Sequence, residues 1–239
     1  SNAQAIGEIF TSHSKVAKFS FTGSTKIGKK LLGQCANGVK RTAMELGGNA
    51  PFIVFKDADM NLAVEGAIAA KFRNSGQTCV TANRFLIHKD IKQNFSEILM
   101  EKIQGLKMGD GLNPENQLGP LVNEQAIDKI KTLVNNAKKQ GAKIILGGKS
   151  LDKSDCGNGT FFEATVIDKV TPQMEIFNTE IFGPVVTLIE FENEEEAINL
   201  ANQTDAGLCA YVYTKNNQLI SDLHEKIEVG MIGINAAKL

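Results

Sequence analysis

Short apolar runs alternate with stretches of helical periodicity along most of the chain. The dense apolar runs, such as PFIVF at 51–55, are typical of buried strands. Strands are predicted at 16–21, 39–45, 51–55, 84–88, 143–146, 164–167, 184–191, 209–213 and 231–235. Helices are predicted at 25–34, from Asp57 or Asp59 to about Asn74, and at 92–104, 124–140, 194–203 and 216–227. This alternation predicts an α/β fold with a mainly parallel twisted sheet, right-handed crossovers and flanking helices.

Composition narrows the class of protein. With 239 residues and 42% hydrophobic content, the chain can form one large or two small α/β domains. Lys and Arg total 26 against 27 Asp and Glu, so no basic surplus favours nucleic acid, and no apolar run reaches membrane-spanning length. The opening Ser1-Asn2-Ala3 is typical of a tag-cleavage remnant, so no fold prediction is based on it.

The cysteines and histidines argue against a disulfide scaffold and a structural metal. Four cysteines are scattered without a C-x-x-C pair, and the three histidines stand alone. This pattern predicts a reducing, cytoplasmic location. By burial statistics most cysteines are inert core residues, and we assign Cys35, Cys156 and Cys209 to that class.

Two motifs in the first part of the chain have chemistry of their own. FTGSTKIG at 21–28 carries a strand into Gly23 and Ser24 and then opens a helix, whose N-terminal N–H groups suit a phosphate. MELGGNAPF at 44–52 places Glu45 at the end of a strand, where apolar neighbours can raise the pKa of a general base. Taken alone, an ordinary N-cap and a surface glutamate explain them better.

Two later motifs add a thiol and a second carboxylate. FRNSGQTCV at 72–80 holds Cys79 on a turn whose backbone N–H groups can stabilise a thiolate and an oxyanion. TEIFGPVV at 179–186 places Glu180, a carboxylate able to accept ribose hydroxyls, beside Phe182, a ring able to flank a flat ligand. Taken alone, a buried inert thiol and an exposed glutamate are again the simpler explanations.

In combination, the four motifs closely resemble the aldehyde dehydrogenase superfamily. The resemblance runs from about Phe19 to Asn235, and GAIAAKFRNSGQTC with ELGGNAPFIVF is most similar to the succinate-semialdehyde dehydrogenase branch. It implies that Cys79 is the nucleophile, that Glu45 activates water, and that Arg73 binds a distal carboxylate. It also implies an NAD or NADP site at Gly23, Ser24, Gly28, Leu46, Gly47, Glu180 and Phe182.

The resemblance also implies what lies beyond this chain. Members of the family are about twice as long, so most of the cofactor domain and the rest of the substrate pocket are expected elsewhere. We expect residues 1–45 to hold the remnant and the last strand–helix–strand of the cofactor domain, and 46–239 to be the catalytic domain. The full-length form is expected to be a homo-oligomer. Thr81 stands where some members carry a second cysteine, so no redox-switch disulfide is expected there.

The sequence therefore predicts oxidation of a small aldehyde, succinate semialdehyde above others, through a thiohemiacetal and a thioester. We expect little dehydrogenase activity from this chain alone. Two alternatives stay open: a non-catalytic remnant that binds no cofactor, and a thiol esterase that needs Cys79 without a cofactor.

Overall fold

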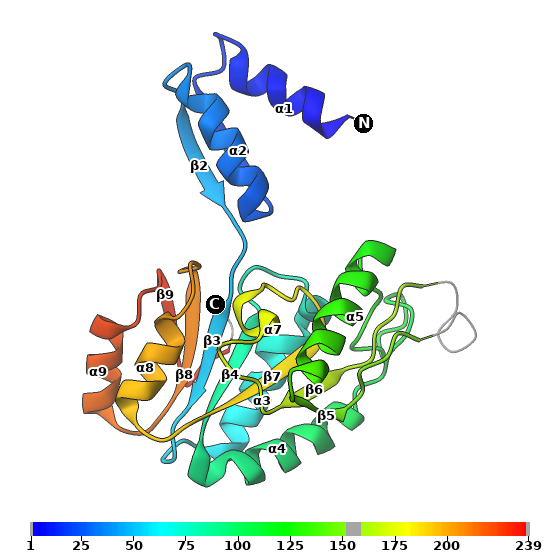
Figure 1. Ribbon diagram of the computed structural model, residues 1–239, viewed down its shortest axis with the longest axis vertical. Helices are drawn as coiled ribbons and strands as arrows, with labels where there is room; N and C mark the ends of the chain where they lie inside the picture. Colours follow the sequence, from blue (N-terminus) through cyan, green and yellow to red (C-terminus); the bar gives the residue numbers. More distant parts are fainter. Residues whose placement is uncertain (1, 152–158, 238–239) are drawn as a thin grey trace. The chain divides into compact units, whose positions relative to one another are not determined.

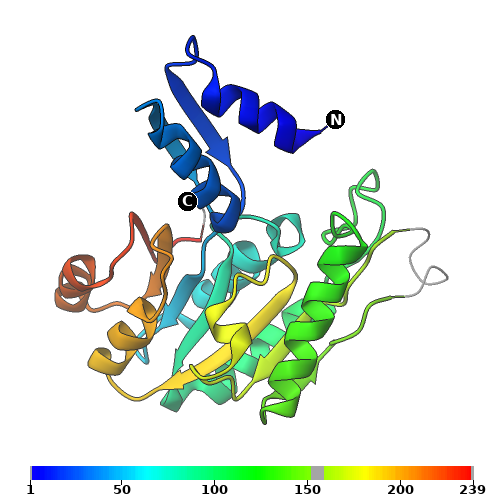
Figure 2. The ribbon, with the colours of Figure 1, turned by 45° about the horizontal axis from the view of Figure 1, so that its top comes forward.

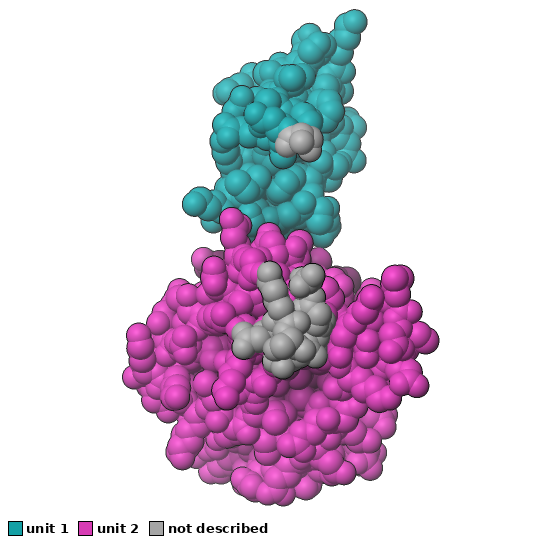
Figure 3. All heavy atoms as spheres, turned by 90° about the vertical axis from the view of Figure 1, so that its right-hand side faces the viewer, with its two compact units in different colours: residues 1–47 teal, residues 48–239 magenta. Residues whose placement is uncertain are grey.

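A computed structural model describes residues 2–151 and 159–237, which form two compact units, 1–47 and 48–239 (Figure 3). Cys156 and most of the predicted surface loop at 149–159 lie outside the described residues. None of the described helices is long and apolar enough to cross a bilayer. The assignment of the two units to a cofactor piece and a catalytic domain stays a prediction.

The first unit pairs two parallel strands with two helices. Strands β1 (Lys18–Thr22) and β2 (Arg41–Glu45) are joined through α2 (Thr25–Ala36), and α1 (Ala3–Ser12) comes before them. Helix α1 was not predicted. The Asn2 side chain caps it by accepting a hydrogen bond from the Ala5 N–H at 3.1 Å. Asn2 and Ala3, set aside above as part of a tag remnant, cap and begin this helix.

The second unit is a seven-stranded sheet in the order β5-β6-β7-β4-β3-β8-β9, with every neighbouring pair parallel except β5 and β6 (Figure 1). The strands are β3 (Ala50–Val54), β4 (Ala82–His88), β5 (Lys143–Leu146), β6 (Thr165–Asp168), β7 (Val185–Phe191), β8 (Cys209–Tyr213) and β9 (Met231–Ile234). The mainly parallel α/β prediction is confirmed. Strand positions agree with the hydrophobic pattern to within two residues at either end.

Helices cover both faces of this sheet, and each face has its own apolar core. One core packs α3 (Met60–Phe72) and α4 (Lys89–Gln104) against strand residues that include Phe52, Phe85 and Tyr211. The other packs α5 (Glu124–Lys139), α7 (Glu175–Asn178), α8 (Glu194–Asn202) and α9 (Asn217–Lys226) against the opposite side chains, such as Ile53 and Leu86. Figure 2 shows α5, in green, along the near face. Period-two alternation thus explains why the central strands are apolar throughout.

The direction of the strands decides where the predicted motifs meet. Parallel strands all begin at one edge of the sheet, here called the amino edge, and all end at the other, the carboxyl edge. Gly48 lies two residues before β3, Cys79 lies shortly before β4, and Glu180 and Phe182 lie shortly before β7. Residues far apart in the chain are thereby brought to the amino edge of the second unit.

Candidate active site

The predicted site residues divide between the two units. Cys79, Arg73, Glu180 and Phe182 belong to the second unit, and Gly23, Ser24, Gly28, Glu45, Leu46 and Gly47 to the first.

In the first unit, the two glycine-containing motifs are neighbours. The Gly23 N–H donates to the carbonyl of Glu45 at 3.0 Å, which extends the β1–β2 register by one bond. Ser24 is the N-cap of α2, and its hydroxyl oxygen accepts from the Ile27 N–H at 3.4 Å. The first turn of α2 contains no acidic residue, so nothing there repels an anion. These features fit the phosphate site that the sequence predicts.

Gly28 and Leu46 have a packing relation. A Cβ added to buried Gly28 would overlap the Leu46 side chain, so the glycine lets the segment after β2 lie against α2. Gly47 is the last residue of the first unit. A cofactor role for these three residues stays a prediction.

In the second unit, Gly48 is the centre of the arrangement. Its N–H donates to Glu180 Oε1 at 3.1 Å, and a Cβ added to it would overlap the carbonyl oxygen of Cys79. One glycine therefore touches both the segment that carries the thiol and the predicted ribose-binding carboxylate. The close approach is possible only because Gly48 has no side chain.

Cys79 is a free, half-buried thiol that follows a strained turn. Asn74, Ser75 and Gly76 have φ values of 51°, 53° and 77°, three consecutive residues in the left-handed region. A Cβ at Gly76 would also overlap the carbonyl oxygen of Gly183, so the turn lies against the loop that carries Glu180 and Phe182. The prediction that the helix ends near Asn74 to Gly76 is confirmed, since α3 stops at Phe72 and a 3₁₀ turn follows it.

Neighbouring groups hold this turn in place. Ser75 Oγ donates to the Gly119 carbonyl at 2.9 Å, and Gln77 Oε1 accepts from the Val122 N–H at 2.9 Å. The Thr78 and Thr81 hydroxyls lie 2.6 Å apart, so Thr81 contributes a hydrogen bond to the segment. Strained backbone that is over-determined by such contacts is typical of functional sites.

Glu180 lies among a backbone N–H donor and two lysines. Burial raises the pKa of its carboxyl, and the Gly48 N–H, Lys129 and Lys71 oppose that rise. Lys129 Nζ also donates to the backbone carbonyl of Glu180 at 2.6 Å.

Phe182 is half-buried with φ 60°, and Arg73 is exposed. Burial likewise raises the pKa of Tyr211, an effect that nearby Arg73 opposes.

A buried polar network lies at the same edge, and sequence reasoning did not assign it to the site. Lys71 is fully buried and donates to Asn83 Oδ1 at 3.3 Å; Asn83 Nδ2 in turn donates to Asn49 Oδ1 at 3.3 Å. Burial lowers the pKa of Lys71 to about 7. One signal was available in the sequence, because Lys71 continues the four-residue spacing of Ala63 and Ala67 on the apolar face of its helix.

Arg84 is hydrogen-bonded to this network through the backbone carbonyl of Asn49. Its guanidinium donates to the carbonyls of Asn49 at 3.0 Å, Leu200 at 2.7 Å and Ala201 at 2.9 Å, and it stacks 5.2 Å from the centre of the Phe177 ring. The buried cation thereby satisfies carbonyls at the C-terminus of α8, where positive charge is favourable.

The whole sequence matches the aldehyde dehydrogenase family, over residues 1–239. The chain belongs to the aldehyde dehydrogenase family. It is 47% identical over 98% of its length to a mitochondrial succinate-semialdehyde dehydrogenase of Oryza sativa, and 45% identical over its full length to a 3-sulfolactaldehyde dehydrogenase of Pseudomonas putida. These matches cover 44% and 48% of the relatives, so the chain spans about half their length.

Solved structures of the family have the same fold. A succinate-semialdehyde dehydrogenase of Burkholderia pseudomallei superposes with a TM-score of 0.96 at 44% identity, covering all of this chain and 48% of that one. A betaine aldehyde dehydrogenase of Staphylococcus aureus, solved in complex with NAD+, gives 0.94 at 37% identity, covering 98% of this chain and 47% of that one. The predicted resemblance is confirmed at the level of the family. The cytoplasmic location stays a prediction, since the rice relative is named as mitochondrial.

Proposed function

We propose that this chain provides the thiol nucleophile and part of the dinucleotide site of an NAD(P)-dependent aldehyde dehydrogenase. The observation that carries the proposal is Gly48, which contacts the Cys79 carbonyl and donates to Glu180. A nucleophile and a carboxylate able to accept ribose hydroxyls thus share one rigid support at the amino edge. Positioning of this kind is what converts two bound reactants into a unimolecular step.

The chemistry follows from the residue types. The Cys79 thiolate adds to the carbonyl carbon of the aldehyde, and the resulting thiohemiacetal loses its hydride and becomes a thioester. NAD(P)+, when bound, accepts that hydride. Glu45 then removes a proton from water, which attacks the thioester and releases the carboxylic acid and the Cys79 thiol.

For the cofactor, Gly23 and Ser24 at the start of α2 would hold phosphate, and Glu180 with Phe182 would hold the ribose and ring. The choice between NAD and NADP is open, and relatives of both kinds are known from their names.

For the substrate, Arg73 favours an aldehyde with a distal anionic group. A guanidinium binds a carboxylate through two parallel hydrogen bonds and remains charged at any working pH. Succinate semialdehyde fits this description, and two of the relatives named above act on it by name. The exposed position of Arg73 leaves its guanidinium accessible to a ligand.

Site-resolved alkylation of the thiols tests the nucleophile. Iodoacetamide should label Cys79 faster than Cys35, Cys156 and Cys209, as read by mass spectrometry of the tryptic peptides. Equal or slower labelling of Cys79 would refute the proposal. A second assay follows NAD(P)H formation with succinate semialdehyde, for which we expect little activity from this chain and none from Cys79→Ser.

The same assays separate the alternatives. Hydrolysis of p-nitrophenyl acetate that depends on Cys79 but not on NAD(P) would favour a thiol esterase. A reactive Cys79 with no NAD(P) binding, even when the remaining half of a relative is supplied, would favour a remnant.

A further inference from the structure

The carbonyl oxygen of Val80, directly after the proposed nucleophile, has two donors from a distant strand. The Tyr211 hydroxyl donates to it at 2.7 Å, and the Cys209 thiol lies 3.6 Å from it. Both donors belong to β8, about 130 residues along the chain, and both face the helix α3 side of the sheet. Their side chains are only 1% and 2% exposed.

The rest of the peptide around Cys79 is equally constrained. The Thr81 N–H donates to the Thr78 carbonyl at 3.1 Å, which makes Cys79 and Val80 the central residues of a β-turn. The Cys79 carbonyl lies against Gly48. The Val80–Thr81 peptide is therefore hydrogen-bonded through both its C=O and its N–H, and Tyr211 supplies the shorter of the two contacts to the C=O.

Both donors keep their protons at neutral pH. Burial raises the pKa of the Cys209 thiol to about 11 and raises the pKa of Tyr211 well above its usual value. A buried hydroxyl also needs an acceptor, since leaving either partner unpaired costs more than the bond itself contributes. Both groups can therefore act as donors to the Val80 carbonyl at neutral pH.

We propose that Tyr211 is a positioning residue for the Cys79 thiol. Its hydroxyl, with the Cys209 thiol as a second donor, fixes the Val80 carbonyl and so the orientation of the turn that presents the nucleophile. The inference rests on the proposed role of Cys79. Small displacements of a reacting group have large effects on rate, which gives a single hydrogen bond at this place a kinetic consequence.

Tyr211→Phe removes only the hydroxyl, and Tyr213→Phe is its matched control. Tyr213 lies on the same strand and stacks on Phe52, but its hydroxyl makes no hydrogen bond with any described residue and is not among the buried unpaired atoms. Each protein is labelled with ¹³C at the valine carbonyls, the Val80 resonance is assigned, and iodoacetamide alkylation of Cys79 is timed across pH by mass spectrometry.

In Tyr211→Phe, the Val80 carbonyl resonance should move upfield, as expected for a lost hydrogen bond. Alkylation of Cys79 should slow by about threefold to tenfold, the range that one net hydrogen bond supplies. Tyr213→Phe should match the wild type in both readouts. Thermal unfolding checks that all the variants fold.

The second donor, the Cys209 thiol, allows an independent test. Cys209→Ala should slow Cys79 in the same direction, and Cys209→Ser, which keeps a donor, should restore the wild-type rate. A Val80 resonance that stays in place in Tyr211→Phe, or one that moves while Cys79 alkylates at the wild-type rate, would overturn the positioning role. Failure of the proposed function looks different, because wild-type Cys79 would then label no faster than Cys35.

Discussion

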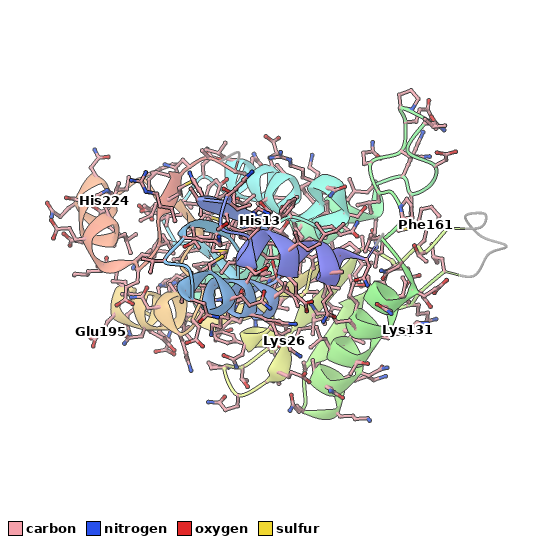
Figure 4. All side chains as sticks on the ribbon, turned by 90° about the horizontal axis from the view of Figure 1, so that it is seen from above. His13, Lys26, Lys131, Phe161, Glu195 and His224 are labelled. Atoms are coloured by element: carbon pink, nitrogen blue, oxygen red, sulfur yellow. The ribbon has the colours of Figure 1, made fainter. Side chains whose placement is uncertain are left out.

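The two edges of the seven-stranded sheet are built in different ways. At the amino edge, backbone meets backbone at Gly48 and Gly76, three consecutive residues are left-handed, and Lys71 and Arg84 are buried with polar partners. At the carboxyl edge, an open depression of ≈ 890 Å³ lies between charged side chains, among them Lys56, Glu194 and Glu195. Figure 4 shows Glu195 projecting outward from α8.

The difference between the two edges shows that the fold class alone does not locate the proposed site. Open α/β sheets commonly bind ligands outside the carboxyl ends of their strands, at the point where neighbouring connections diverge. Here β3 and β8 form such a pair, and the depression lies at their carboxyl ends. The thiol and the strained turn nevertheless lie at the opposite edge. The residues and their contacts, and not the fold class, therefore locate the proposed chemistry.

The largest expected effect at the amino edge comes from Arg84→Met. The change removes a buried cation and leaves the carbonyls of Asn49, Leu200 and Ala201 without their donor. We expect the free energy of unfolding to fall by about 3–5 kcal/mol, as measured by urea denaturation. Lys56→Met at the carboxyl edge is the control and should change it by less than about 0.5 kcal/mol. Equal losses of unfolding free energy in Arg84→Met and Lys56→Met would contradict the idea that the amino edge is the more tightly constrained of the two.

Lys71→Met should change how stability depends on pH. Burial lowers the pKa of Lys71 from 10.5 to about 7, so the unfolded chain binds more protons between these values. Stability should therefore rise with pH across this window, and the cost of the buried lysine is greatest at and below pH 7. The stabilisation that Lys71→Met confers should be larger at pH 7 than at pH 10 by roughly 3 kcal/mol.

Denaturant unfolding of both proteins at the two pH values measures that difference. Lys131→Met removes an exposed lysine that projects from α5 (Figure 4) and controls for the change of side chain. A Lys71→Met variant whose advantage is the same at both pH values would show that Lys71 is charged in the folded protein.

Gly48→Ala tests the close approach at the centre of the site. The new Cβ would overlap the Cys79 carbonyl oxygen, which is backbone and cannot turn away. We expect a loss of about 1–3 kcal/mol in unfolding free energy and a change in the alkylation rate of Cys79. Gly111→Ala, with no atom within 4 Å of its Cβ, should affect neither. An unchanged Cys79 rate in Gly48→Ala would mean that Gly48 does not hold the nucleophile.

The smallest effect is expected from Lys169→Gly at the carboxyl edge. Lys169 follows β6 with φ 58°, a conformation that glycine adopts without strain. Its replacement should raise the unfolding free energy by about 1 kcal/mol, measured by thermal unfolding, and should leave Cys79 alkylation unchanged. A change in the alkylation rate of Cys79 would show that the two edges of the sheet are coupled.

Much of the fold was predictable because the signals are local. The apolar run at 209–213 predicted β8 with its observed ends, and the helix predicted at 124–140 is observed as α5, Glu124–Lys139. The missed element α1 has a helical pattern of its own, since Ile6, Ile9 and Phe10 stand at i, i+3 and i+4, and the prediction overlooked it. Cys209 was assigned to the inert class, and its raised pKa agrees, but its contact with the Val80 carbonyl was not predictable.

The sequence by itself determined the α/β class, the order of the elements and the family, because hydrophobic period and motif wording are properties of neighbouring residues. Tertiary structure alone decided that Gly48, Cys79 and Glu180 meet at the amino edge, and that Tyr211 reaches the peptide after Cys79. It also decided that Lys71 and Arg84 are buried. These outcomes depend on strand order and register, which bring residues more than a hundred positions apart within hydrogen-bond distance.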